Sequence, residues 1–255
     1  MGKSLFRAMA WTILLSILAL FLSLALWGPG AASVTADAPL EGQALPEATC
    51  APSPGEKLIA LTFDDGPRRS TTTRLLDGLA QRGVQATFFL IGAQVAGNED
   101  VIRRMDQEGH QIGLHTYDHV KLTGLNQADF DAQVEKTRQV LKEVLGHNDF
   151  LLRPPYGMQD EIVRQRAGCP IILWSIDPED WDDRNASRVV EHVVSNARDG
   201  GIILMHDIFP ESVDAALEIV DRLHNQGYLF CTIDQLFDAR GIPLEGGEFY
   251  WNAYP

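Results

Sequence analysis

Most side chains that could do chemistry in this 255-residue chain follow short apolar runs typical of β-strands. Asp64 and Asp65 come directly after the first run, and His115 and His119 follow the third. Three later runs end in further polar segments: Arg153-Pro154-Pro155-Tyr156, Asp177-Pro178-Glu179-Asp180-Trp181 and Leu204-Met205-His206-Asp207. The carboxyl ends of parallel strands in a barrel open on one face, where active sites lie. The pattern therefore predicts one site built from five strand ends.

The residue types in this set are those of metal-assisted hydrolysis. His115 and His119, four residues apart, can present ring nitrogens to one ion, and one carboxylate completes the set. Coordination positions then remain for water and substrate, as a catalytic Zn²⁺ or similar ion requires. The ion lowers the pKa of its water to about 7, and a second carboxylate can take the proton. Asp64 and Asp65 are the candidates for the two carboxylate roles.

Two further side chains complete this chemistry. Arg153 has a reason to lie beside the carboxylate base, because a neighbouring guanidinium keeps a buried carboxylate ionised. Departure of an amine needs a proton donor, and His206 is the natural acid. An aspartate accepting from the far ring nitrogen would orient that histidine. Asp180 and Asp177, both in the segment after the fifth strand, are the candidates for this role.

Each motif also has a purely structural interpretation. Asp-Asp-Gly alone is usually a turn after a strand, a pair of histidines four apart is often solvated or packed, and Trp181 alone could be a core residue. These interpretations would have to coincide at five strand ends in chain order, which favours a functional site. Four other histidines belong to no such group, and we predict them on the surface: His110, His147, His192 and His224.

From Glu56 onward the apolar runs alternate with amphipathic stretches, which predicts an α/β fold. The predicted strands are Leu58–Phe63, Ala86–Ile91, Gln111–Leu114, Phe150–Arg153, Ile171–Ser175, Ile202–Met205 and Tyr228–Ile233. The predicted helices are Thr71–Arg82, Asn126–Leu145, Ala186–Arg198 and Glu211–Gln226. Strands alternating with helices form parallel sheets through right-handed crossovers. No glycine-rich phosphate turn follows the first strand, which removes a dinucleotide-binding fold.

The length of this region restricts the architecture further. It has about 180 residues, whereas a regular eightfold barrel typically needs about 250. We therefore predict a distorted or incomplete (β/α) barrel with about seven parallel strands. The formal net charge is -14 and no Lys/Arg cluster interrupts it, so we expect no nucleic-acid partner.

The first 55 residues are predicted to lie outside the catalytic domain. Lys3 and Arg7 precede an uncharged apolar run over residues 8–27, which is typical of an export signal. Residues 1–36 are then either a cleaved signal peptide or an anchor that holds the protein to the membrane through residues 8–27. Residues 37–55 are a Pro/Ala-rich linker, 56–240 the catalytic domain and 241–255 a C-terminal tail. Both alternatives predict an extracytoplasmic, secreted or membrane-anchored protein.

The three cysteines, Cys50, Cys169 and Cys231, have no CxxC or Cys/His spacing, so no thiolate metal site is expected. Cys231 lies among alternating apolar residues, which favours a small buried side chain. An odd number of cysteines leaves at least one thiol without an intrachain disulfide partner.

The motifs taken together resemble those of the polysaccharide deacetylase family, also called the NodB-homology or carbohydrate esterase family 4 group. They are Thr62-Phe63-Asp64-Asp65-Gly66, His115-Thr116-Tyr117-Asp118-His119, Arg153-Pro154-Pro155-Tyr156, Asp177-Pro178-Glu179-Asp180-Trp181 and Leu204-Met205-His206. The resemblance covers about Glu56 to Arg240 and includes all five motifs of the family in order. The fold that it implies, a distorted (β/α) barrel, agrees with the prediction from the strand pattern.

The resemblance also implies a role for each matching residue. Asp64 would be the base, oriented by Arg153, and His206 the general acid, tethered by Asp180. The metal ligands would be Asp65, His115 and His119. The backbone N–H of Tyr156 would contribute to the oxyanion hole, in a loop shaped by Pro155, and Trp181 and Leu204 would form the pocket for the acetyl methyl group. The cofactor would be one divalent ion, with Zn²⁺ favoured and Co²⁺ the alternative.

The resemblance implies an enzyme that removes acetyl groups from an N-acetylated polysaccharide. Members of the family act on peptidoglycan, chitin and xylan, and export favours the N-acetylglucosamine residues of peptidoglycan as substrate. The alternatives are a chito-oligosaccharide deacetylase, an O-acetylxylan esterase, or an inactive glycan-binding module. A binding module would not need the proton donor His206. We expect the protein to act as a monomer.

Overall fold

The computed structural model describes residues 56–255, and the predicted signal or anchor (1–36) and the predicted linker (37–55) lie outside them. The strands are β1 (Lys57–Asp64), β2 (Thr87–Leu90), β3 (Gln111–Leu114), β4 (Leu151–Leu152), β5 (Ile171–Ile172), β6 (Gly201–His206), β7 (Tyr228–Cys231) and β8 (Phe249–Tyr250). The helices are α2 (Arg69–Arg82), α3 (Glu99–Gln107), α4 (Gln127–Leu145), α5 (Glu161–Arg166), α6 (Ala186–Asn196), α7 (Pro210–Asn225) and α8 (Ile233–Ala239), with 3-10 turns at Gly92–Gln94 and Pro155–Gly157. None of the described helices is long and apolar enough to cross a membrane.

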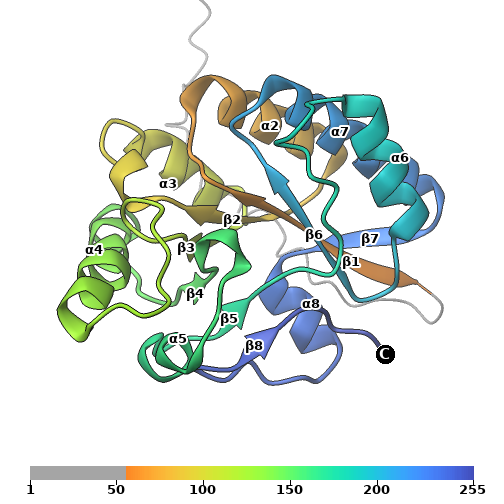
Figure 1. Ribbon diagram of the computed structural model, residues 1–255. Helices are drawn as coiled ribbons and strands as arrows, with labels where there is room; N and C mark the ends of the chain where they lie inside the picture. Colours follow the sequence, from red (N-terminus) through yellow and green to blue (C-terminus); the bar gives the residue numbers. More distant parts are fainter. Residues whose placement is uncertain (1–55) are drawn as a thin grey trace, which may run out of the picture. The chain divides into compact units, whose positions relative to one another are not determined.

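The strands form one parallel sheet in the order β6-β1-β2-β3-β4-β5-β8, and β7 pairs with the first half of β1 (Figure 1). Beyond β5 the chain returns to β6 through an isolated parallel bridge between Ile176 and Ile203. The sheet therefore curls until its two ends meet through an irregular segment rather than a regular strand pair. This arrangement confirms the predicted α/β fold with an incomplete (β/α) barrel.

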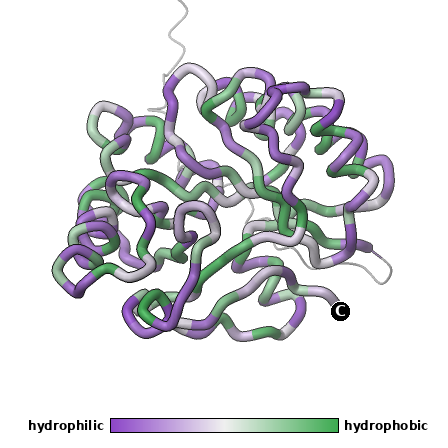
Figure 2. Tube along the Cα trace, viewed as in Figure 1, coloured by the Kyte–Doolittle hydropathy of each residue, from purple (hydrophilic) through white to green (hydrophobic). Residues whose placement is uncertain are grey.

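Hydrophobic residues recur along the strands (Figure 2). Their side chains form two clusters, one on each face of the sheet. An outer core packs between the strands and the surrounding helices. An inner core fills the barrel and is closed by α8, with Leu58, Ala60, Phe89, Leu151, Ile172, Ile202 and Cys231 as its strand residues. Cys231 is fully buried there, as predicted. Burial on both faces explains why the strands are nearly continuous apolar runs.

The four predicted helices are present with ends shifted by two residues or fewer. Asn126 caps α4 by accepting a hydrogen bond from the N–H of Asp129 at 3.0 Å. Gly83 and Gly146 end α2 and α4 in the left-handed conformation, with φ of 63° and 82°. Such stop signals are local, and the glycines made these helix ends predictable.

The segment 241–255, predicted as a tail, takes part in the barrel. Its strand β8 pairs with β5, and the Ala253 N–H donates to the carbonyl of Gly200 at 2.8 Å. The ring of Tyr250 packs edge-on against Phe237 of α8, with ring centres 5.2 Å apart. This role could not be predicted, because the residues before β8 are polar or glycine and a two-residue strand is too short to show an apolar–polar alternation.

Gly113 of β3 has no side chain, and the ring of Phe89 occupies the space beside it. A Cβ atom there would lie 2.5 Å from the Phe89 ring and 3.1 Å from the carbonyl oxygen of Leu151. We predict that Gly113→Ala destabilises the protein by about 1–3 kcal/mol, because overpacking displaces neighbouring side chains. Urea unfolding measures this change. Gly246→Ala is the matched control, since its Cβ would meet nothing closer than 3.4 Å; equal stability of the two variants would contradict the predicted crowding.

Candidate active site

The alternation of side chains along each strand places the polar groups inside the barrel. Leu58 and Ala60 of β1 face the inner core, whereas Ile59, Leu61 and Phe63 pack in the outer core. Asp64 has the same parity as Leu58 and therefore faces inward at the end of the strand. The same parity relates His115 to Gly113, Arg153 to Leu151, and Leu204 and His206 to Ile202.

Asp65, His115 and His119 converge at the open end of the barrel, and their ligand atoms lie within 4.8 Å of one another. The Oδ1 atom of Asp65 is 3.4 Å from Nε2 of His115 and 3.2 Å from Nε2 of His119. Burial on its own raises the pKa of Asp65, but the neighbouring imidazoles of His115, His206 and His119 outweigh it and lower this pKa. The three predicted ligands are thus together, with the carboxylate in its ionised form.

The proton positions at this group favour a cation. Nδ1 of His115 lies 2.8 Å from the carbonyl oxygen of Arg153. A carbonyl only accepts, so Nδ1 must carry the proton, and the neutral ring then has a lone pair on Nε2. Burial is the main cause that lowers the pKa of His119, which favours its neutral ring. Oδ1 of Asp65 is buried and accepts no hydrogen bond among the described groups. Acceptors that face one another without donors match the donor set of a divalent ion such as Zn²⁺.

Asp64 lies beside this group and is held by Arg153. The Nη1 group of Arg153 donates to Oδ1 of Asp64 at 2.8 Å and to the Thr62 hydroxyl at 2.7 Å. Oδ2 of Asp64 points toward the ligands, 3.7 Å from Nε2 of His115. Arg153 is fully buried, and its other donors reach the carbonyls of Ile172 and Leu173. One carboxylate oxygen of Asp64 therefore fixes its orientation while the other faces the site.

His206 is paired with Asp180, and Asp177 has a different partner. The Nδ1 atom of His206 lies 2.8 Å from Oδ1 of Asp180, and its backbone N–H donates to Oδ2 at 2.9 Å. Asp177 accepts instead from the N–H of Glu179 at 2.9 Å. Burial on its own lowers the pKa of His206, but the bond to Asp180 and the charges of nearby carboxylates raise it to about 9. The imidazolium form is thus stable at neutral pH.

These groups line one cavity of about 420 Å³. Three of the predicted substrate-binding residues are on its wall, namely Tyr156, Trp181 and Leu204. The fourth, Pro155, is buried and is not among the lining residues. Trp181 is 50% exposed and Tyr156 60%, so two aromatic rings stand at the mouth of the cavity. Such rings give a sugar both apolar area and an orienting edge.

The lining also includes Trp174, Asp177 and Phe209, of which the sequence had suggested only Asp177, and for another role. Trp174 lies beyond β5 with the inward parity of Ile172, so strand alternation could have identified it. Phe209 comes from the turn before α7, and nothing in the local sequence distinguishes it from a core residue.

Left-handed backbone is concentrated in the loops of the site. The positive φ angles are 71° at Asp65, 61° at Thr116, 55° at His119, 63° at Tyr156 and 53° at Glu179. Residues with a Cβ atom adopt this region at a cost of about 1–3 kcal/mol unless a short polar side chain relieves it. Functional sites collect such strain, because it is retained only where the surrounding structure enforces it.

Asp207, the last residue of the segment that contains His206, lies behind the loop of Asp65, a role that the sequence does not reveal. Its carboxyl group is fully buried and accepts a hydrogen bond from the Thr72 hydroxyl. Burial raises its pKa to about 7. A Cβ atom on Gly66 would lie 2.6 Å from Oδ1 of Asp207, so glycine is needed where the loop passes this group.

The surface prediction for His110 is wrong, since only 5% of this residue is exposed. Its Nδ1 atom accepts a hydrogen bond from the N–H of Ala86 at 3.0 Å, and burial lowers its pKa to about 4. The neutral ring can be buried because a backbone donor satisfies its polar edge. His147, His192 and His224 are on the surface, as predicted.

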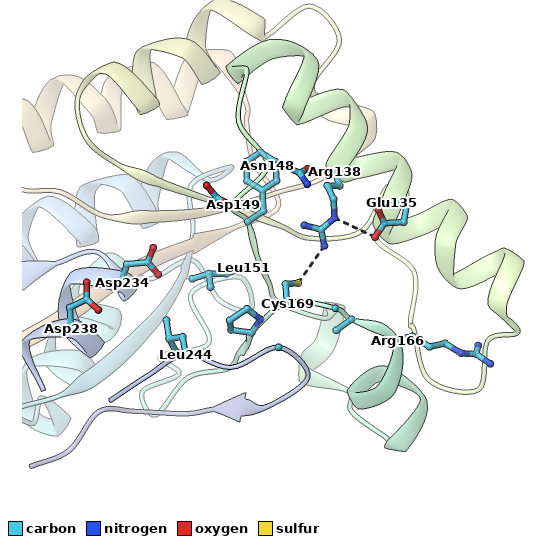
Figure 3. A pocket seen from close by; sticks show the side chains of 15 residues that line it. Glu135, Arg138, Asn148, Asp149, Leu151, Arg166, Cys169, Asp234, Asp238 and Leu244 are labelled. Carbon is cyan, nitrogen blue, oxygen red and sulfur yellow. Dashed lines mark hydrogen bonds and ion pairs between the residues drawn. The ribbon is translucent and has the colours of Figure 1, made fainter. Parts of the chain in front are cut away.

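A larger cavity, of about 710 Å³, lies at the amino ends of β4 and β5 (Figure 3). The guanidinium of Arg138 donates there to Glu135 at 3.3 Å and to the sulfur of Cys169 at 3.5 Å. Burial is the main cause that raises the pKa of the Cys169 thiol, so this sulfur stays protonated and unreactive. The chemistry of the molecule is at the other end of the strands.

Comparison with known proteins agrees with this geometry. A family model described as polysaccharide deacetylase matches residues 51–168. The chain is 40% identical over 187 residues to a peptidoglycan-N-acetylmuramic acid deacetylase of Bacillus subtilis, a match covering 73% of the chain. It is 41% identical over 196 residues to a peptidoglycan-N-acetylglucosamine deacetylase of Listeria monocytogenes, a match covering 77% of the chain. The matches cover only 40% and 41% of those two longer proteins.

A solved structure matches over nearly its full length. It is a family 4 acetyl xylan esterase from Clostridium thermocellum in complex with a cobalt ion, with a TM-score of 0.73 and 30% identity. The match covers 77% of the chain and 98% of that structure. The likeness therefore extends over the whole barrel.

The ligand set predicts how metal binding responds to mutation. We expect His119→Ala to weaken Zn²⁺ binding by more than about 100-fold, because loss of a residue that only supports a ligand already costs about 10–100-fold. Asp64→Asn should keep the metal. Metal content after dialysis measures both. His192→Ala removes an exposed histidine and is the control; a metal-free Asp64→Asn, or a fully loaded His119→Ala, would contradict the assigned ligands.

Proposed function

The chain belongs to the polysaccharide deacetylase family, and we propose that it hydrolyses the N-acetyl amide of N-acetylglucosamine residues in a cell-wall glycan, peptidoglycan first. The observation that carries this proposal is the content of one cavity. It brings together three ligands for a divalent ion, a carboxylate held by a buried guanidinium, and a histidine with a raised pKa. Metal-assisted hydrolysis of an amide uses these three functions.

We propose Zn²⁺ as the ion, with Co²⁺ as the alternative that the cobalt-containing relative supports. Asp65, His115 and His119 would hold it. When bound, such an ion polarises the acetyl carbonyl and makes water acidic enough to be deprotonated near neutral pH.

Asp64 is the proposed general base. Its Oδ1 is engaged by Arg153, so Oδ2, which faces the ligands, is the oxygen that can accept a proton from water. The positive charge of Arg153 lies against the other oxygen of the same carboxylate, 2.8 Å away. The proton ends on Asp64 while the water oxygen attacks the acetyl carbon.

His206 is the proposed general acid. Its Nδ1 proton is held by Asp180, which leaves Nε2–H to protonate the departing amine. The wall formed by Trp181 and Leu204 would receive the acetyl methyl group. The backbone N–H of Tyr156, in the loop that includes Pro155, would donate to the oxygen that becomes negative.

The alternative substrates are a chito-oligosaccharide and O-acetylxylan, and the alternative of another class is an inactive glycan-binding module. The two exposed rings would serve any of these glycans. The buried Arg153–Asp64 pair and the raised pKa of His206 favour an enzyme, because binding a sugar requires neither.

We propose an extracytoplasmic location and a monomeric protein, with residues 1–36 as signal or membrane anchor. This proposal rests on the uncharged run 8–27 after Lys3 and Arg7. Fractionation of the native cells with and without detergent distinguishes a cleaved signal from an anchor.

The function predicts acetate release from purified peptidoglycan in the presence of Zn²⁺ or Co²⁺. Chitopentaose and acetylxylan belong in the same panel, and the best substrate identifies the glycan class. Asp64→Asn should lower turnover at least about 100-fold, since acid–base catalysis contributes about 10²–10⁴-fold. No release from any of the three glycans by the metal-loaded protein would refute the deacetylase assignment.

The activity should depend on pH as a bell, because Asp64 must be ionised and His206 protonated. With the pKa of His206 raised to about 9, the alkaline limb should fall near that value. Asp180→Asn removes the main cause that raises this pKa, so the alkaline limb should move to lower pH and turnover should drop by about tenfold or more. Asp177→Asn is the control; if it moved the limb while Asp180→Asn did not, the tether would be Asp177.

A further inference from the structure

A further cavity, of about 410 Å³, adjoins the metal ligands. It shares Asp65 and His119 with the active-site cavity of about 420 Å³. Its remaining wall consists of two isoleucines, a carboxamide and a guanidinium: Ile91, Ile208, Gln94 and Arg68. A glycan with its acetyl group at the metal would therefore have its neighbouring substituents within reach of this wall.

Arg68 is the charged group of this wall, and it lacks an ionic partner. No carboxylate of residues 56–255 forms an ion pair with it, in a chain whose net charge is -14. Its neighbour Arg69, by contrast, pairs with Asp100 at 2.6 Å, and Arg74 pairs with Asp214. A guanidinium without an ionic partner in the protein can bind an anionic group of a ligand.

Arg68 is also held in place. Its Nη1 group donates to the carbonyl oxygen of Ile208 at 3.0 Å, so the side chain is tied to another residue that lines the cavity. A guanidinium has five N–H donors in a planar fork, and this one bond leaves others for a ligand. Such forks match carboxylates in a bidentate way. The apolar wall and the Gln94 amide suit a short acid with a hydrocarbon part.

A second cation borders the first cavity. The guanidinium carbon of Arg184 lies 4.3 Å from the ring centre of Phe209, which lines that cavity, and Arg184 is exposed and outside the ion pairs of residues 56–255. A guanidinium therefore borders each of the two cavities that meet at the metal ligands.

From these observations we infer that the substrate is a carboxylate-bearing glycan and that Arg68 binds the carboxylate beside the metal site. This inference rests on the proposed function and narrows its substrate class. Peptidoglycan offers two sources of the carboxylate: the lactyl ether of a muramic residue without its peptide, and the stem peptide itself. Chitin carries neither. The carboxylate binds without any covalent change. Arg68 therefore affects which glycan binds and takes no part in the hydrolysis of the acetyl group.

The test is a binding measurement with the Zn²⁺-loaded full-length Asp64→Asn protein, whose slow turnover allows the affinity for a glycan to be measured. Calorimetry compares chitopentaose with muramic-containing strands of the same length, both stripped of peptides and bearing them. We expect at least one carboxylated strand to bind about three- to tenfold tighter, as one well-placed guanidinium–carboxylate pair allows. Tighter binding of the stripped strand would identify the lactyl carboxylate as the ligand of Arg68. Tighter binding of only the peptide-bearing strand would identify the stem peptide.

Adding Arg68→Gln to this protein should bring the ratio of its affinity for the carboxylated strand to its affinity for chitopentaose to about one. The matched control is Arg198→Gln, an exposed arginine at the amino end of β6, which should leave the ratio unchanged. High salt should reduce the ratio in the parent protein because it screens exposed charges.

An unchanged ratio in Arg68→Gln would overturn the inference. So would an equal loss of affinity for neutral and carboxylated glycans, which would mean that Arg68 only holds the Ile208 loop. Acetate release by the unmutated protein is measured separately: failure to release acetate refutes the deacetylase proposal, whereas the affinity ratio decides the role of Arg68.

Discussion

The arrangement of this barrel depends on the burial of one charge. The guanidinium of Arg153 has no exposed surface, and an unpaired charge there would cost several kcal/mol. Its donors reach Asp64, Thr62 and two carbonyls beyond β4, while its flat face lies 4.2 Å from the centre of the Phe89 ring. Compensating this charge holds β1, β4 and β5 together and fixes the orientation of the Asp64 carboxylate. The carbonyl of the same residue fixes the tautomer of His115. One residue thereby couples the packing of the barrel to the base and to a metal ligand.

The site combines acceptor atoms that lack a donor with a histidine whose charge is stabilised by an aspartate. Three acceptor atoms face one another at the strand ends, in loops whose backbone is strained, and a cation would relieve their repulsion. On the other side, Asp180 stabilises the charged form of His206 against the effect of burial. The folded chain therefore already has the charges that hydrolysis requires, in fixed positions. Such preorganisation is the main way in which a protein lowers the barrier of a polar reaction.

Local patterns made most of this predictable, and long-range contacts account for the remainder. Glycines marked the ends of α2 and α4, and the apolar runs marked seven strands whose ends carried the polar residues. Strand β8 could not be foreseen, because its two residues are held by the edge of β5 rather than by any pattern of their own. His110 was misplaced because its burial depends on the backbone of Ala86, 24 residues away. Asp207 and Phe209 support and line the site only through the loops that fold against them.

The central claim is that Asp65, His115 and His119 bind one catalytic ion while Asp64, held by Arg153, stays free of it. Anomalous diffraction from crystals grown with Zn²⁺ and recorded at the zinc absorption edge tests this claim most directly. We expect a single strong peak about 2.0–2.2 Å from one carboxylate oxygen of Asp65 and from Nε2 of both histidines. The Arg153–Asp64 pair should remain intact beside it. An ion coordinated by Asp64, or a peak elsewhere with none at these residues, would contradict the account.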